Sequence, residues 1–248
     1  MSAGGPSAPT TPLGWMELQT RALFVHDARG RLRARNEPGA APPPRLFLGR
    51  TRVGALWRLA ADLPPPLVRD LARLAAAERR VGDPSRDPER LAVMRERLET
   101  HAPVEAIWRG PAFRFPEALP DAPDTRVLDP SERAHAARRF AWPEAASGSA
   151  EVRELAGRTP VVGAFAGGEL ASVCFAATGP APAVEAGLAT LPGFRGRGLG
   201  PRAVAAWASA VRREGRIPLY STSADNRASR RVAGKLGLIL YGWDLHLR

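Results

Sequence analysis

The sequence predicts a mixed α+β protein in which helices cover a mixed β-sheet. The chain has 248 residues, 44% of them hydrophobic, which is enough for one large domain or two small ones. Strand-like and helix-like segments occur in both halves of the chain. In the second half they follow the order strand, helix, hairpin, strand, helix, strand, helix, strand, and this order predicts a mixed sheet.

The first half of the chain predicts a disordered tail followed by a smaller α+β domain. Residues 1–15 are rich in Gly, Ser, Pro and Thr, and they lack the basic and apolar regions of a signal peptide. We expect a tail over residues 1–15 and an N-terminal domain over residues 16–117. Its expected elements are a hairpin of strands at 22–26 and 32–35, a strand at 46–48, helices at 53–61 and 67–75, a helix from an N-cap at Asp87 to Leu98, and strands at 104–108 and 113–115.

The second half predicts a further domain over residues 118–248. A proline-rich stretch at 116–123 marks the boundary. Asp129 is expected to cap a helix, and Glu132 to close its capping box. The other expected elements are strands at 125–128, 161–165, 170–176 and 184–190, a helix at 201–214, a strand at 217–222, a helix from Ala228 to Leu236, and a strand at 238–247.

Composition and charge restrict the functions and partners that the protein can have. The formal net charge is +11, and Lys235 is the only lysine among 36 Lys and Arg residues, as in proteins from GC-rich genomes. This charge is weak evidence for a nucleic-acid partner, and no nucleic-acid-binding motif accompanies it. Cys174 is the only cysteine, which excludes a disulfide framework and a thiolate zinc cluster, and no two histidines have metal-binding spacing. No apolar run reaches the roughly 18–20 residues that cross a bilayer, so we expect a cytoplasmic protein with neither membrane nor metal.

The most informative segment is the run Arg195–Gly200, RGRGLG, between an expected strand and an expected helix. Glycines let the backbone turn tightly and approach a ligand closely. The helix that follows offers free N–H groups and the positive end of its dipole, an arrangement that binds pyrophosphate. A flexible turn is the alternative explanation of the loop alone. The spacing does not fit the dinucleotide-binding G-x-G-x-x-G pattern, and the Walker lysine is missing.

The pattern Arg195-x-x-Gly198-x-Gly200 resembles the R/Q-x-x-G-x-G/A acyl-CoA signature of the GNAT superfamily of N-acyltransferases. The run at 190–198, TLPGFRGRG, is also similar to the corresponding run in the glycine N-acyltransferase-like branch of that superfamily. Both similarities fall on the same loop, so the family resemblance and the chemistry of the glycines point to the same ligand.

The resemblance extends beyond the loop. Asn226, Ser229 and the run at 235–238, KLGL, follow in the order of the family's C-terminal motif. The similarity is good over about 159–248 and fainter over 118–158. It implies a mixed, mostly antiparallel sheet flanked by helices, and it allows the first domain to be a degenerate copy of the same fold.

The resemblance implies acetyl-CoA, or another acyl-CoA, as co-substrate. Amides of the glycine loop would hold the pyrophosphate, and the strand at 184–190 would separate from the next strand and pair with the pantetheine arm. Asn226 would contact the pantetheine or the helix start, while Ser229 and Arg230 would lie near the adenosine phosphates. The implied cofactor-binding residues are Leu188, Ala189, Thr190, Arg195, Gly196, Arg197, Gly198, Leu199, Gly200, Asn226, Ser229 and Arg230.

In such enzymes an amine attacks the thioester directly, which requires a base for the amine and a donor for the departing thiolate. Glu185 is the candidate base, although its register in the strand would require a β-bulge, and a solvent-facing role is the alternative. Many family members place a tyrosine seven residues after the asparagine, and that position here is Ala233. Tyr220 or a water is the candidate substitute, unless Tyr220 is a core residue.

Together these features predict an N-acyltransferase that moves an acyl group to the primary amine of a small molecule or peptide. A non-catalytic CoA-binding module or sensor is the alternative, and Ala233 favours it. Nucleic-acid binding ranks last. Trp108, Trp142 and Trp243 could border an acceptor pocket or lie in the core, and Cys174 is expected to be a buried packing residue. The sequence leaves open which amine is the acceptor and whether the protein forms a homodimer.

Overall fold

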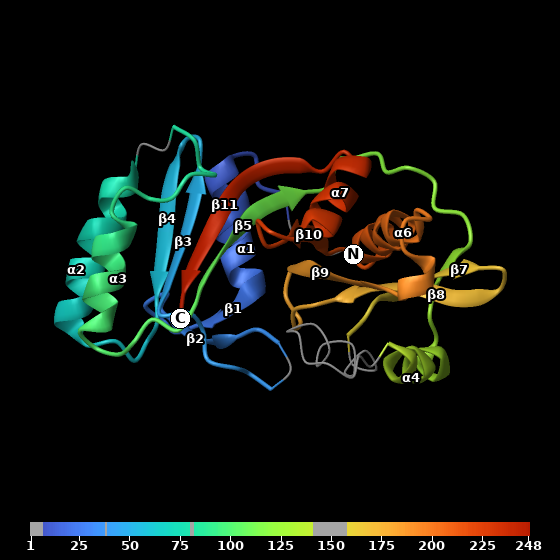
Figure 1. Ribbon diagram of the computed structural model, residues 1–248, viewed down its shortest axis with the longest axis horizontal. Helices are drawn as coiled ribbons and strands as arrows, with labels where there is room; N and C mark the ends of the chain where they lie inside the picture. The colour runs from blue at the N-terminus through green and yellow to red at the C-terminus, as the bar shows by residue number, and fades with distance from the viewer. Residues whose placement is uncertain (1–6, 38, 80–81, 141–157) are drawn as a thin grey trace, which may run out of the picture. The chain divides into compact units, whose positions relative to one another are not determined.

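The computed structural model describes residues 7–37, 39–79, 82–140 and 158–248. The chain divides into two compact units, each assembled from separate stretches of sequence. Unit 1 contains Phe115–Tyr220 and Ala228–Leu238. Unit 2 contains Ala8–Arg114, Ser221–Arg227 and Ile239–Arg248. Figure 1 follows the chain by colour from the N-terminus to the C-terminus.

Unit 1 is built on a mixed sheet whose strands lie in the order β10-β9-β8-β7-β6. The neighbours from β6 to β9 pair antiparallel, and β9 and β10 pair parallel. The strands are β6 (Thr125–Val127), β7 (Val161–Ala166), β8 (Glu169–Ala176), β9 (Ala183–Thr190) and β10 (Ile217–Ser221). This arrangement confirms the predicted fold class, a mixed and mostly antiparallel sheet flanked by helices.

The helices of unit 1 are α4 (Pro130–Arg139), α6 (Leu199–Arg213) and α7 (Arg227–Lys235), with a 3₁₀ turn at Pro192–Phe194. Helix α4 begins as predicted, because Asp129 accepts from the Glu132 N–H and the Glu132 carboxylate accepts from the Asp129 N–H. Helices α4 and α6 lie on opposite sides of the sheet (Figure 1). The α4 side is apolar, and its core includes Phe140, Val173 and Phe175.

Unit 2 contains antiparallel sheet strands in the order β4-β3-β11-β5. These strands are β3 (Leu46–Thr51), β4 (Gly54–Leu59), β5 (Ile107–Arg114) and β11 (Ile239–Leu247). The predicted hairpin is confirmed as β1 (Phe24–His26) and β2 (Leu32–Arg35). The C-terminal strand β11 therefore lies between two strands from the first half of the chain.

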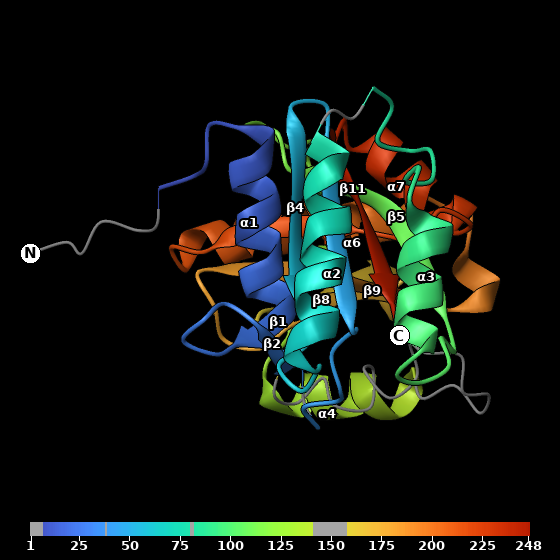
Figure 2. The ribbon, with the colours of Figure 1, turned by 90° about the vertical axis from the view of Figure 1, so that its left-hand side faces the viewer.

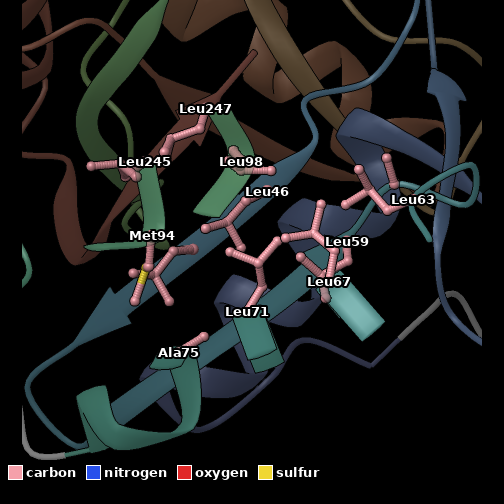
Figure 3. Packing of buried hydrophobic residues seen from close by; sticks show 12 residues of the cluster. Leu46, Leu59, Leu63, Leu67, Leu71, Ala75, Met94, Leu98, Leu245 and Leu247 are labelled. Atoms are coloured by element: carbon pink, nitrogen blue, oxygen red, sulfur yellow. The ribbon is translucent and has the colours of Figure 1, made fainter. Parts of the chain in front are cut away.

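Helices α2 (Pro65–Ala76) and α3 (Leu91–Glu99) run side by side in unit 2 (Figure 2) and cover one face of its sheet. A 3₁₀ turn at Ala77–Arg79 follows α2. Figure 3 shows the leucine-rich core between these helices and the sheet. Its labelled members come from β3, β4, β11, α2, α3 and the loop before α2: Leu46, Leu59, Leu63, Leu67, Leu71, Ala75, Met94, Leu98, Leu245 and Leu247.

Helix α1 (Pro12–Leu23) covers the opposite face of that sheet. Side chains alternate along β3, so Gly49 faces away from the leucine core. A Cβ at Gly49 would lie 2.3 Å from Met16 Cγ, which shows how closely α1 approaches the strand.

The predicted disordered tail is wrong for residues 12–15, which belong to α1 and where Trp15 is already buried. Residues 1–6 lie outside the described residues.

Three other expectations for the first half are wrong. The helix expected at 53–61 is strand β4, because it forms a tight hairpin with β3 in which Thr51 pairs with Gly54. The two strands expected at 104–108 and 113–115 are parts of one strand, β5. Asp87 does not cap a helix, since α3 begins at Leu91 and the Asp87 carboxylate forms an ion pair with Arg109.

The units also depart from the boundary expected near residue 117. Residues 239–248 were expected to complete the second domain, but they pair with β3 and β5 in unit 2. Among the described residues, no helix combines the length and apolar character needed to span a bilayer.

Candidate functional site

Strands β9 and β10 are paired only near their N-terminal ends. The parallel register runs from Ile217 opposite Ala183 to Leu219 opposite Glu185. Strand β9 then continues through residues 186–190 with β8 as its paired neighbour. We call the point where the two strands separate, after Glu185 and Leu219, the strand vertex. The predicted separation of this strand from its neighbour is therefore present.

Backbone groups on the separated part of β9 are directed toward the gap. The Glu185 C=O accepts from the Ala177 N–H at 2.8 Å, so Glu185 bonds toward β8. Bonding directions alternate along an antiparallel strand, which turns the N–H and C=O groups of Leu188 and Thr190 away from β8. The Thr190 C=O accepts from Arg195 Nε at 3.3 Å. The edge at Leu188 is thus oriented to pair with an extended ligand.

The loop after β9 depends on two glycines with positive φ. Gly196 and Gly198 both have φ of 81°, in the left-handed region that side chains with a Cβ enter at a cost of about 1–2 kcal/mol. Gly198 is the N-cap of α6. These conformations turn the chain from β9 into the helix within four residues of Arg195.

The first turn of α6 directs free N–H groups toward the loop, as helix N-termini do. Leu199 and Gly200 are buried there, and Pro201 occupies a first-turn position where its missing N–H costs nothing. A Cβ at Gly200 would lie 3.4 Å from Leu188 Cδ2 and 3.5 Å from Thr190 Oγ1, which are ordinary contacts. Gly200 is therefore compatible with alanine, whereas Gly198 is not.

Three arginines surround the loop. Arg195 is exposed and donates to the Thr190 C=O, and Arg197 is exposed with its guanidinium 5.2 Å from the Phe194 ring centre. Arg202 lies 3.7 Å from the Asp124 carboxylate. A groove of about 640 Å³ opens beside the loop, and its lining includes Arg126, Phe165, Gly168, Arg197, Leu199 and Arg202. The loop therefore lies in a cationic environment suited to phosphate groups.

Glu185 is buried at the vertex, with 4% of its surface exposed. Two-residue alternation places it on the face of β9 that carries Ala189, which packs in the α4-side core. The β-bulge that the base role was expected to require is absent, because the pairings of β9 with β8 and β10 run without a register shift. The solvent-facing alternative is wrong. The Glu185 N–H donates to Thr178 Oγ1 at 3.2 Å.

Tyr220 follows Leu219 and so lies on the opposite face of the vertex from Glu185. Its hydroxyl lies 2.6 Å from Ser229 Oγ on α7. The ring packs edge-on against Phe115, with centres 6.4 Å apart. Burial raises the pKa of Tyr220 well above its usual range, and the nearby Cys174 and Glu185 add to the rise while the Ser229 bond opposes it. The phenol therefore stays protonated.

The other residues singled out from the sequence on or near α7, and Cys174 on β8, differ in how far they are exposed. Asn226 is exposed just before α7 and donates its N–H to the Ser223 C=O at 3.1 Å. Arg230 is exposed on α7, and Ala233 is buried one helical turn after Ser229. Cys174 is fully buried, as predicted, and burial raises the pKa of its thiol.

The tryptophans do not identify an acceptor pocket. Trp108 and Trp243 lie on β5 and β11 in unit 2, and Trp142 lies outside the described residues. Across the described ranges, no group of three or more His, Cys, Asp and Glu side chains could hold a metal ion.

Sequence reasoning missed the polar support beneath β9. The fully buried Ser172 donates to the Ala189 C=O at 2.8 Å, and its hydroxyl lies 2.7 Å from Thr190 Oγ1. Both bonds hold the end of β9 where it enters the glycine loop. A serine inside the apolar run of β8 was the available signal, since a buried hydroxyl requires a partner.

Comparisons with known proteins fall on this part of the chain. Residues 161–245 match the family model described as FR47-like protein. A search of curated proteins found no match.

Solved structures described as acetyltransferases are similar at low identity. A protein from Novosphingobium aromaticivorans is 23% identical over 58% of this chain and 65% of its own, just under two thirds, with a TM-score of 0.43. An acetyltransferase from Colwellia psychrerythraea is 11% identical over 77% of this chain and 75% of its own, with a TM-score of 0.49. YncA from Salmonella typhimurium, solved with acetyl-CoA, is 15% identical over 53% of this chain and 94% of its own, with a TM-score of 0.38.

Proposed function

We propose that this chain, whose residues 161–245 match the FR47-like family model, is an acetyltransferase of the GNAT superfamily and transfers an acyl group from acyl-CoA to a primary amine. One observation carries the proposal: β9 separates from β10 at the vertex and leads directly into the glycine loop. The gap supplies an unpaired strand edge, and the loop supplies N–H donors at its end. Together they match an extended arm that is joined to a pyrophosphate, as the pantetheine arm of CoA is.

In the proposed complex, the amides of residues 197–200 hold the pyrophosphate of CoA. The pantetheine arm pairs with the β9 edge at Leu188, which places the thioester between the strands beside residues 188–190. Arg230 lies near the adenosine phosphates. The exposed Arg195 and Arg197 add favourable charge to this end of the ligand.

The chemistry follows from the two faces of the vertex. The amine nitrogen attacks the thioester carbonyl, and Glu185 takes the proton that the new C–N bond releases. N–H groups directed into the gap from β9 stabilise the oxyanion. When the C–S bond breaks, sulfur keeps the electron pair and accepts a hydrogen bond from the Tyr220 hydroxyl. Because a thiol has a pKa of about 8.5, its anion can leave without a full proton transfer from the phenol.

A second candidate function is a CoA-binding module that does not catalyse transfer. Ala233 supports it, because an alanine buried on α7 has no proton to donate where many family members have a tyrosine. The two functions differ in turnover. An acyltransferase releases free CoA from acetyl-CoA only when an acceptor amine is present, whereas a binding module releases none. The finer assignment to the glycine N-acyltransferase-like branch stays a prediction.

Calorimetric titration with acetyl-CoA and CoA tests the proposed site, using Gly198→Ala and Gly200→Ala as a matched pair. We expect roughly micromolar binding to the natural protein. Gly198→Ala should weaken it about tenfold, because alanine at φ 81° costs about 1–2 kcal/mol or forces the loop to move. Gly200→Ala should bind normally, since its Cβ meets only ordinary contacts. Equal affinity in both variants would show that the cofactor binds elsewhere.

A further inference from the structure

The hydrogen bond between Tyr220 and Ser229 joins the vertex to the helix that lacks the family's tyrosine. Tyr220 Oη lies 2.6 Å from Ser229 Oγ and 3.4 Å from the Ser229 C=O. Ser229 precedes Ala233 by four residues, so the two share one face of α7. A hydroxyl from the neighbouring strand thus reaches the helix face where the alanine leaves no donor.

The surroundings of the pair restrict where the phenol oxygen can point. The Tyr220 ring is 2% exposed and is held from one side by Phe115. Packing of this kind fixes a ring but leaves the orientation of a hydroxyl to its hydrogen-bond partner. Tyr220 directly follows Leu219, which pairs with Glu185, so the phenol belongs to the residue at which β10 leaves β9.

We propose that Ser229 is a positioning residue, which holds the Tyr220 hydroxyl where it donates a hydrogen bond to the CoA thiolate. This inference rests on the proposed acyl transfer and changes the role of Ser229, which the family resemblance places near the adenosine phosphates. In the step itself, the C–N bond forms and the C–S bond breaks. The sulfur keeps the electron pair, the amine proton passes to Glu185, and Tyr220 keeps its own proton while sharing it with sulfur.

The ionisation of bound CoA gives a test that does not depend on finding the acceptor amine. Thiolate absorbance can be titrated with pH in complexes of CoA with the natural protein, Ser229→Ala, Ser229→Thr and Tyr220→Phe. A donated hydrogen bond favours the thiolate. We expect Ser229→Ala and Tyr220→Phe each to lower the acid dissociation constant of the bound thiol about tenfold. Ser229→Thr retains the hydroxyl and should restore it.

Kinetics with two donors separate positioning from phosphate binding. With acetyl-CoA, Ser229→Ala should lower kcat about tenfold and leave KM nearly unchanged, and adding Tyr220→Phe should cost little more because the two act as a pair. The same defect should persist with acetyl-pantetheine, which lacks the adenosine phosphates. A defect confined to acetyl-CoA would assign Ser229 to the phosphates and overturn the positioning role.

The outcomes also separate this inference from the proposed function. If CoA binds and its thiol ionises identically in all four proteins, the Tyr220–Ser229 pair is a packing feature, and the acyltransferase proposal stands without it. If the natural protein binds no CoA, the acyltransferase proposal fails and the inference fails with it. Urea unfolding of each variant confirms that the comparison is made between folded proteins.

Discussion

At the scale of single residues, the vertex places two ionisable side chains on opposite faces of one point in the sheet. Glu185 shares the α4 side of β9 with Ala189, and Tyr220 on β10 reaches toward α7. An acyl group held between the strands would therefore meet a carboxylate on one face and a phenol on the other. Such an arrangement suits a reaction in which the nucleophile arrives and the leaving group departs in different directions.

The Glu185→Gln variant tests the role of the carboxylate. If Glu185 removes the amine proton, the variant should bind CoA as tightly as the natural protein and react about 10²-fold or more slowly. The loss should be largest at low pH, where more of the amine is protonated and hydroxide is scarce. Rates measured across pH with saturating acetyl-CoA check this. Unchanged rates at every pH would remove Glu185 from the mechanism.

The glycine loop was predictable from sequence because its chemistry is local. Glycine spacing and the following helix start lie within six residues, so the predicted turn is confirmed by the positive φ of Gly196 and Gly198. The environment of Glu185 was not predictable, since its burial depends on elements remote in the sequence. The Tyr220–Ser229 bond likewise joins a strand and a helix, and a single sequence gives no measure of that distance.

At the scale of secondary-structure elements, sequence patterns predicted an element correctly where the burial of one of its faces determines its structure. They failed where contacts with neighbouring elements determine it. Strands β7, β8 and β9 were expected within one or two residues, and so was the capping box of α4. Helix α1 was missed although Thr11 and Pro12 form a regular N-terminal signal, because the run before them is rich in Gly, Ser and Pro. Strand β5 was split by Gly110 and Pro111, which are usual strand breakers.

Gly110 has a structural reason to interrupt that pattern. A Cβ there would lie 1.8 Å from the Thr222 backbone oxygen, so only glycine allows this approach. The contact is reinforced on either side, since the Thr222 N–H donates to the Pro111 C=O at 3.3 Å and the Ala224 N–H donates to the Arg109 C=O at 2.9 Å.

Gly110→Ala should therefore force the backbone apart and lower the free energy of unfolding by about 2–4 kcal/mol. Gly82→Ala is the matched control, because nothing lies within 4 Å of its added Cβ and its φ is not positive. Urea titration of both variants measures the difference. Equal midpoints would mean that the segment at 221–227 adjusts freely and does not depend on the glycine.

At the scale of the whole chain, order in sequence and order in the sheet differ. The boundary expected near residue 117 assumed that consecutive elements stay together, which is the usual tendency. Strand β11 departs from it and separates β3 from β5 in unit 2. Its sequence gave no sign of this, because its alternating apolar residues fit any buried strand, and only long-range pairing selects the partners.

The stability of the first half of the chain should consequently depend on the last strand. Leu245 is 3% exposed and belongs to the leucine core with Leu71 and Met94 (Figure 3). Leu245→Ala should cost about 2–5 kcal/mol, and hydrogen exchange should show reduced protection in β3, α2 and α3, far away in sequence. Val53→Ala, at a side chain 62% exposed, is the control and should leave exchange unchanged. If β3 and α2 kept full protection in Leu245→Ala, β11 would not be part of the core that stabilises the N-terminal half.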